Sequence, residues 1–296
     1  MAGQEQFRLR HGAFELAFCP RCGGSITRFR YHGLNLLRPA GPAFFATGDP
    51  REAACFPLVP FSNRIADARF ELEGREYQLE RNFPPEPHAI HGHGWQHPWS
   101  VAEVAEDDAT LAFEHRLPGT PFAYRARQHF ALGTDGLTVT IEVTNRGAAA
   151  MPAGLGLHPY FIRTPDVTLE AGLGHVWLSD ARKLPQERVP LPSEWNFTQP
   201  RPLAGLDLDN CFGVWNGRAV IRWPESGLAL IVEADPLFGH LVVYVPPGED
   251  FFCVEPVSHV NDGFNLMARG VPDTGVRILA PGETLCGRMG LRPGQV

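Results

Sequence analysis

Residues 124–144 read YRARQHFALGTDGLTVTIEVT, and this stretch carries the clearest structural signal in the chain. In its second half apolar and polar side chains alternate, so that Leu137, Val139, Ile141 and Val143 point to one side. A period of two predicts a strand with one buried face. The segment GTDG separates this run from a second alternating run at residues 124–132, and the whole stretch therefore predicts a β-hairpin.

Two more hairpins of the same design are predicted elsewhere in the chain. Residues 70–72 and 77–79 flank a turn at Gly74, and residues 220–223 and 228–232 flank the turn-forming segment PESG. In each case short runs rich in apolar residues are separated by glycine, proline or small polar residues, which is the pattern of paired antiparallel strands.

Helix signals are weak throughout the sequence. No run of ten or more residues has the apolar spacing of an amphipathic helix free of glycine and proline, and the 31 glycines and 28 prolines are spread along the chain. We therefore predict one all-β domain over residues 1–296. A chain of hairpins this long forms a barrel or a large two-sheet sandwich, with its ligand on a concave face.

Composition and charge exclude several classes of partner. The chain has 26 basic and 33 acidic residues and a pI near 5.9, so we expect no nucleic-acid partner. The N-terminus lacks the pattern of a secretory signal, and no apolar run reaches the length of a membrane span, so we expect a cytoplasmic protein without a membrane partner. The six cysteines are too sparse for a disulfide framework and fit reduced, packed thiols. We expect a monomer or a homodimer.

Residues 88–97 read HAIHGHGWQH and carry four histidines. As a metal site, His91 and His93 would lie on one face of a strand, but the glutamate that such a β-barrel site needs a few residues later is missing. A metal-free polar site is favoured, because imidazole and indole groups can hydrogen-bond a sugar and stack on its apolar face. The ordinary alternative is that most of these histidines are solvated or packed in the core.

Two polar residues interrupt otherwise apolar segments. His158 lies in LGLHPYF, where the following proline favours an extended backbone, and it is either a satisfied core histidine or a general acid. Glu255 lies in FFCVEPV, a strand that is apolar on both faces. Burial would raise its pKa toward neutrality, as a general base requires, and the alternative is an acid paired with an arginine such as Arg64.

Weaker signals come from three other places. Asp207 and Asp209 alternate with leucines and would share one face, where they could accept hydrogen bonds from hydroxyl groups, although solvated acids at a turn are commoner. Asn63 and Arg64 place an amide beside a guanidinium, a useful pair for a polyhydroxyl ligand. The CxxC segment at residues 19–22 lacks the second pair of a zinc finger, so we predict no zinc or redox role for it.

These segments occur in a specific order over nearly the whole chain. They are Gly23-Gly24, Asn63-Arg64-Ile65, Phe70 with the Gly74 hairpin, Asn82 leading to His91-Gly92 and Trp99, His158-Pro159-Tyr160-Phe161, Leu208-Asp209-Asn210-Cys211-Phe212, and Val254-Glu255-Pro256 running to residues 261–265. Each segment alone is a modest signal, but their joint order and spacing resemble the aldose 1-epimerase (galactose mutarotase) family.

The resemblance implies a large single-domain antiparallel β-sandwich with an open carbohydrate cleft. It also implies an isomerase that interconverts the α and β anomers of a free aldohexose by ring opening and reclosure, with a monosaccharide as its partner and no cofactor or metal. Glu255 matches the general base of the family, His158 the general acid, and His91 a second histidine that hydrogen-bonds the ring oxygen or its neighbour. The matching sugar-binding positions are Asn63, Arg64 and Asp209.

One departure from the family pattern and three alternatives remain. Val242 stands where the family usually has a glutamine, two residues before the matching tyrosine, Tyr244, and this leaves the preference between galactose and glucose open. The family also contains epimerases of phosphorylated sugars. A sugar-binding or regulatory protein without catalysis could use the same scaffold, and a metal-dependent β-barrel enzyme could use residues 88–97.

Overall fold

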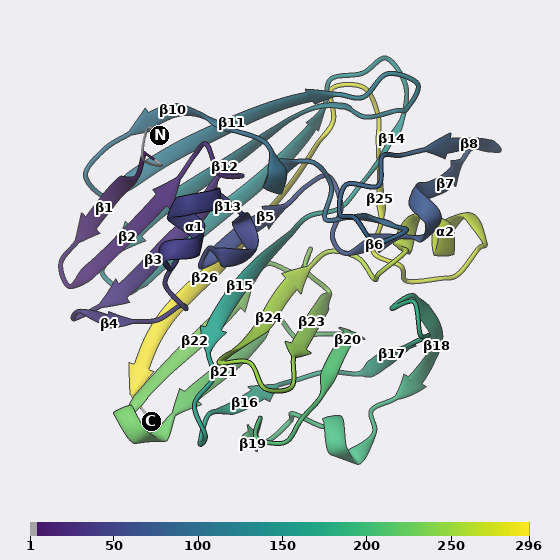
Figure 1. Ribbon diagram of the computed structural model, residues 1–296. Helices are drawn as coiled ribbons and strands as arrows, with labels where there is room; N and C mark the ends of the chain where they lie inside the picture. The colour runs from purple at the N-terminus through teal and green to yellow at the C-terminus, as the bar shows by residue number, and fades with distance from the viewer. Residues whose placement is uncertain (1–4, 296) are drawn as a thin grey trace.

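The computed structural model describes residues 5–295, and most of its strands form two large antiparallel sheets (Figure 1). The eleven-stranded sheet contains, in spatial order, β1 (Phe7–His11), β2 (Phe14–Cys19), β3 (Ser25–Tyr31), β5 (Cys55–Leu58), β15 (Gly156–Ile162), β24 (Phe251–Val257), β23 (His240–Val245), β20 (Leu208–Gly213), β17 (His175–Ser179) and β18 (Pro185–Pro190), with β4 (Leu34–Asn35) paired to β3. The nine-stranded sheet contains β10 (Ser100–Val104), β11 (Asp108–Arg116), β12 (Ala123–Gly133), β13 (Gly136–Asn145), β26 (Thr284–Gln295), β22 (Leu228–Ala234), β21 (Arg218–Trp223), β16 (Thr168–Ala171) and β19 (Arg201–Pro202). The predicted all-β architecture is confirmed.

The hairpin at residues 124–144 forms as predicted. β12 and β13 pair antiparallel over their whole length, from Tyr124 opposite Asn145 to Gly133 opposite Gly136. The apolar residues at alternate positions of β13, from Leu137 to Val143, are fully buried between the sheets, and the polar residues between them are partly exposed. The hairpins β21–β22 and β7 (Arg69–Leu72) with β8 (Arg75–Gln78) form as well.

The eleven-stranded sheet is covered on both faces at its centre, which explains why residues 251–257 are apolar on both sides. On β24, Phe252 and Val254 point into the core shared with the nine-stranded sheet. Cys253 belongs to a second apolar cluster, because alternate residues of a strand face opposite ways. Glu255 shares this second face, here called the outer face of the sheet.

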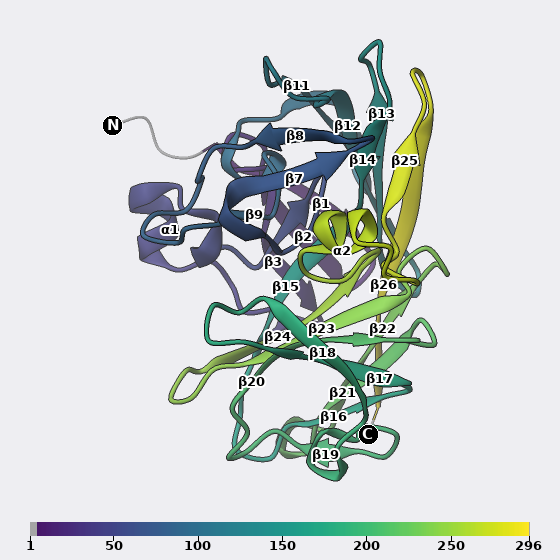
Figure 2. The same ribbon diagram turned by 90° about the vertical axis from the view of Figure 1, so that its right-hand side faces the viewer.

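Short elements complete the fold. They are the two-stranded sheets β14 (Met151–Ala153) with β25 (Arg277–Leu279) and β6 (Arg64–Ile65) with β9 (Ala89–Ile90), the helices α1 (Pro42–Thr47) and α2 (Gly263–Ala268), and the 3₁₀ turns η1 (Pro50–Glu52), η2 (Ala66–Ala68), η3 (Gly94–Gln96), η4 (Ser193–Trp195) and η5 (Pro224–Ser226). Figure 2 shows α2 beside the β7–β8 hairpin, where the Asn265 side chain donates a 2.9 Å hydrogen bond to the Arg69 carbonyl. Within residues 5–295, no helix has the length and apolar character needed to cross a membrane.

Candidate functional site

A cavity of about 420 Å³ opens on the outer face of the eleven-stranded sheet. Its volume lies in the usual range of small-molecule sites. Aromatic side chains, among them Phe56, Trp95 and Tyr160, form part of its wall. The polar part of the wall includes all six residues that the sequence predicts as catalytic or sugar-binding, namely Asn63, Arg64, His91, His158, Asp209 and Glu255.

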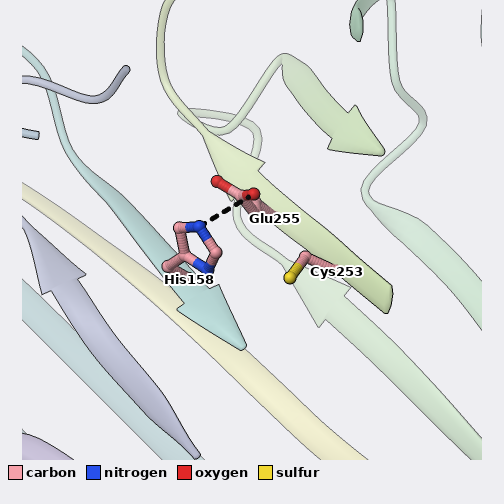
Figure 3. Close-up of side chains that lie close together, drawn as sticks. All are labelled: His158, Cys253 and Glu255. Carbon is pink, nitrogen blue, oxygen red and sulfur yellow. Dashed lines mark ion pairs between the residues drawn. The ribbon is translucent and has the colours of Figure 1, made fainter. Parts of the chain in front are cut away.

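His158 and Glu255 form a close pair at this cavity. They lie on neighbouring antiparallel strands, β15 and β24, and their side chains meet with His158 Nε2 3.3 Å from Glu255 Oε1 (Figure 3). Only 10% of the histidine side chain and 3% of the glutamate side chain are exposed. The second carboxylate oxygen, Oε2, is buried and has no hydrogen-bond partner among residues 5–295.

Burial shifts the pKa of both members of this pair toward the uncharged form. Desolvation raises the pKa of Glu255 well above its ordinary value; the nearby Asp209 carboxylate raises it further, and Arg64 opposes the rise. Desolvation lowers the pKa of His158 to about 3. Both shifts favour a protonated carboxyl beside a neutral imidazole, and at 3.3 Å the two groups lie close enough to pass a proton between them.

The alternative in which Arg64 neutralises Glu255 is wrong. The Arg64 guanidinium pairs with Glu86, at 2.9 Å, and also donates to the Asn63 side-chain oxygen at 3.3 Å. Among residues 5–295, the ion-pair partner of Glu255 is His158. Arg64 therefore reaches the cavity as a fixed donor held by Glu86, while Glu255 stays a buried acid without a guanidinium partner.

His91 reaches the cavity from a strained loop that follows β9. Its backbone has a φ of 60°, and Gly92 next to it has a φ of 68°. A Cβ at Gly92 would lie 2.0 Å from the Val59 carbonyl oxygen, so only glycine fits. The Asn82 side chain holds the loop through the carbonyls of Ile90 and Gly92.

A backbone hydrogen bond fixes the tautomer of His91. The Asn63 backbone N–H donates to His91 Nδ1 over 3.0 Å. Burial lowers the pKa of His91 well below its ordinary value, so the ring is neutral and its proton lies on Nε2. His91 can therefore serve the cavity as a neutral hydrogen-bond donor.

The metal alternative places His91 and His93 on one face of a strand, and this is wrong, because β9 ends at Ile90 and the chain turns there. His93 points away from the cavity, where its Nδ1 lies 3.1 Å from the Tyr124 hydroxyl and its ring stacks on His115 at 4.0 Å. His88 accepts a hydrogen bond from the Asp67 backbone. The histidines of this segment thus have separate environments. His88 and His93 match the alternative in which histidines are packed in the core.

Further residues correct or extend the predicted set. Asp207 is exposed and precedes β20, so it does not share the position of Asp209, which lines the cavity and lies 3.4 Å from Lys183. Sequence reasoning missed Arg38, because no local pattern connects it with the other cavity residues. It also missed Cys253, although its position two residues before Glu255 places both on the same face of the strand.

Comparison with known proteins gives consistent results. The family model described as Aldose 1-epimerase matches residues 5–292. The uncharacterised Escherichia coli K12 protein YphB is 39% identical over 97% of this chain and 98% of its own. The crystal structure of an Escherichia coli K12 protein described as a candidate aldose 1-epimerase has a TM-score of 0.91 at 38% identity and covers 99% of both chains. A galactose mutarotase-like protein from Clostridium acetobutylicum has the same fold, with a TM-score of 0.85 at 21% identity over 98% of this chain and 95% of its own.

Proposed function

The chain belongs to the aldose 1-epimerase family, and from that premise we propose that it is a mutarotase that interconverts the α and β anomers of a free aldohexose. The observation that carries the proposal is the buried His158–Glu255 pair, with 3.3 Å between Nε2 and Oε1, at a cavity of about 420 Å³. Anomer exchange needs one group that accepts a proton and one that donates a proton on the same substrate, and this pair supplies both.

In the proposed reaction, the Glu255 carboxylate takes the proton of the C1 hydroxyl while protonated His158 gives a proton to the ring oxygen. The C1–O5 bond breaks, and the open-chain aldehyde forms. Rotation about the C1–C2 bond presents the other face of the carbonyl. On closure His158 takes the proton of the C5 hydroxyl and Glu255 returns its proton to the carbonyl oxygen, so that the pair regains its starting state.

Burial favours the form of the pair that exists while the sugar ring is open. While the ring is open, Glu255 is protonated and His158 is neutral, which is the state that desolvation favours for both groups. The proton transfer thus removes two buried charges at the stage where the substrate has lost its ring bond. His91, as a neutral donor, would hydrogen-bond the ring oxygen or its neighbour, while Asn63, Arg64 and Asp209 would bind hydroxyl groups.

Polarimetry on freshly dissolved α-anomers of several aldoses tests the proposal. The wild-type protein should accelerate the approach to the anomeric equilibrium over the spontaneous rate for at least one free sugar, and Glu255→Gln should not. If neither protein accelerates any free sugar while both bind one, the chain is a sugar-binding protein on this scaffold.

One observation favours a second candidate, an epimerase of a phosphorylated sugar. The Arg38 guanidinium lines the cavity and lies 4.2 Å above the Tyr160 ring and 4.7 Å above the Phe251 ring. It donates to the Arg51 and Ala53 carbonyls but forms no ion pair within residues 5–295. A half-buried guanidinium that has no carboxylate to neutralise it suits a phosphate group. The acidic side chains of Glu52 and Glu249 in the same wall oppose this. If only an aldose 6-phosphate is turned over, and Arg38→Gln raises its KM at least about tenfold, the second candidate replaces the first.

A further inference from the structure

The proposed reaction leaves one buried nucleophile of the site unused. Cys253 lies two residues before Glu255 on β24, on the same outer face, and its side chain is fully buried. The Cys253 sulfur, one carboxylate oxygen of Glu255 and one ring nitrogen of His158 all lie within 4.8 Å of one another. Figure 3 shows the three side chains converging from two neighbouring strands.

A thiol, an imidazole and a carboxylate are the three donor types that proteins use for Zn²⁺. At ordinary Zn–S, Zn–N and Zn–O bond lengths, donors in a tetrahedral site lie about 3.3–3.6 Å apart. His158 Nε2 and Glu255 Oε1 already have this separation, at 3.3 Å. The sulfur lies within 4.8 Å of the other two donors, and coordination would have to draw it to a similar distance.

An unsatisfied polar atom points independently to a missing ligand. Glu255 is 3% exposed, yet its Oε2 has no hydrogen-bond partner among residues 5–295. A buried carboxylate oxygen without a partner is unfavourable, and a cation between the three side chains would satisfy it. Because Glu255 and His158 both line the cavity, a cation can enter through it and keep one coordination position open toward it.

We propose that Cys253, Glu255 and His158 form a binding site for a thiophilic divalent cation of the Zn²⁺ type. Coordination replaces the thiol proton of Cys253 and the carboxyl proton of Glu255, and both protons leave to solvent. The site goes beyond the proposed function, because the cation occupies the groups that would act as acid and base. In an active mutarotase, Zn²⁺ would therefore be an inhibitor that competes with the sugar, and this last statement alone rests on the proposed function.

The test measures metal binding in the absence of sugar, with Co²⁺ as the spectroscopic probe and Zn²⁺ as the competitor. The wild-type chain should bind one Co²⁺ with a near-ultraviolet sulfur-to-cobalt charge-transfer band, and one equivalent of Zn²⁺ should abolish that band. Cys253→Ala should lose the band and weaken Zn²⁺ binding at least about tenfold. Mutation of a residue that only hydrogen-bonds a metal ligand already weakens metal binding by about this factor, so the loss of a ligand should cost no less.

Cys211 provides the matched control. It is buried to the same degree, lies on the outer face of the same sheet on β20, and is not a member of the three-residue group. Cys211→Ala should keep the cobalt band and the Zn²⁺ affinity of the wild type. Glu255→Gln, which spares the thiol, should keep the band but weaken the affinity, and circular dichroism confirms that each variant is folded.

Absence of a saturable cobalt band in the wild type would overturn the proposal, as would a band that survives in Cys253→Ala or disappears equally in Cys211→Ala. These outcomes are independent of catalysis. A chain that binds Zn²⁺ through Cys253 but has no mutarotase activity retains the metal site and loses the proposed function, and an active chain without the cobalt band does the reverse.

Discussion

His91 and His93 are two residues apart, and burial lowers the pKa of both, yet their side chains lie in different environments. His91 lines the cavity, and a backbone donor occupies its Nδ1, so that its proton lies on Nε2. His93 faces the other way, hydrogen-bonds Tyr124 and stacks on His115. The glycine between them, with a φ of 68°, is where the chain turns from the cavity toward the core.

The comparison shows that burial and a lowered pKa do not by themselves identify a functional histidine. Both histidines have these properties. What distinguishes the cavity region is that it brings a buried acid and a buried imidazole together with an open space beside them, whereas the His93 region is filled by aromatic rings.

Glu255→Gln should have the largest effect. Loss of a general base reduces kcat by about 10²–10⁴-fold, while the shape and most hydrogen bonds of the cavity survive. Polarimetry gives the rate and isothermal titration gives sugar binding, which should stay within about tenfold of the wild type. Wild-type turnover in this variant would show that the general base is another residue and that this cavity is not the active site.

His91→Gln and His93→Gln form the direct test of the comparison. His91→Gln removes a cavity donor and should reduce kcat/KM at least about tenfold, as the loss of one hydrogen bond to a reacting centre does. His93→Gln changes a side chain on the other side of Gly92 and should leave kcat/KM within about threefold. Equal losses in the two variants would show that the cavity does not distinguish these histidines.

For the free energy of unfolding, we expect the order to reverse, so that a change at His93 matters more than a change at the cavity. His93→Ala leaves the buried Tyr124 hydroxyl without its partner and opens space beside His115, so we expect a loss of about 1–3 kcal/mol in the free energy of unfolding. Urea denaturation measures this value, and His93→Gln, which retains a polar side chain, is the control with a smaller loss. A fully stable His93→Ala variant would mean that the cluster adds nothing to the fold.

The sequence predicts the strands well and the loops poorly. Alternation over residues 124–144 predicts a hairpin that the structure confirms strand by strand, because a half-buried strand imposes a period of two on its own residues. Glu255 stands out because a charge in a doubly buried strand is unfavourable without a reason. The shared face that a metal site would require of His91 and His93 does not occur, because the chain turns at Gly92, which packs against Val59, a residue distant in sequence. Arg38 was missed for the same reason.

His93 and Glu255 should also respond to acid with opposite signs. Burial lowers the pKa of His93 to about 3, so the unfolded chain binds a proton that the folded chain excludes. Its contribution to stability is complete above pH 6.5 and is lost as the pH falls from 6.5 toward 3, by up to about 1.4 kcal/mol per pH unit. Glu255 has a raised pKa, so it favours the folded state below its unfolded pKa and disfavours it as the pH rises through the folded pKa.

Urea denaturation at a series of pH values separates these contributions. His93→Gln should lessen the loss of stability between pH 6.5 and 4, because the variant no longer binds that proton on unfolding. Glu255→Gln should raise the free energy of unfolding at neutral pH, where the wild type must hold a buried charge or a buried proton, and should leave the histidine-dependent loss in place. A fall in stability at neutral pH in Glu255→Gln would mean that the ionised carboxylate stabilises the fold. Glu255 would then belong to a structural ion pair, and not to a functional site that lowers the stability of the fold.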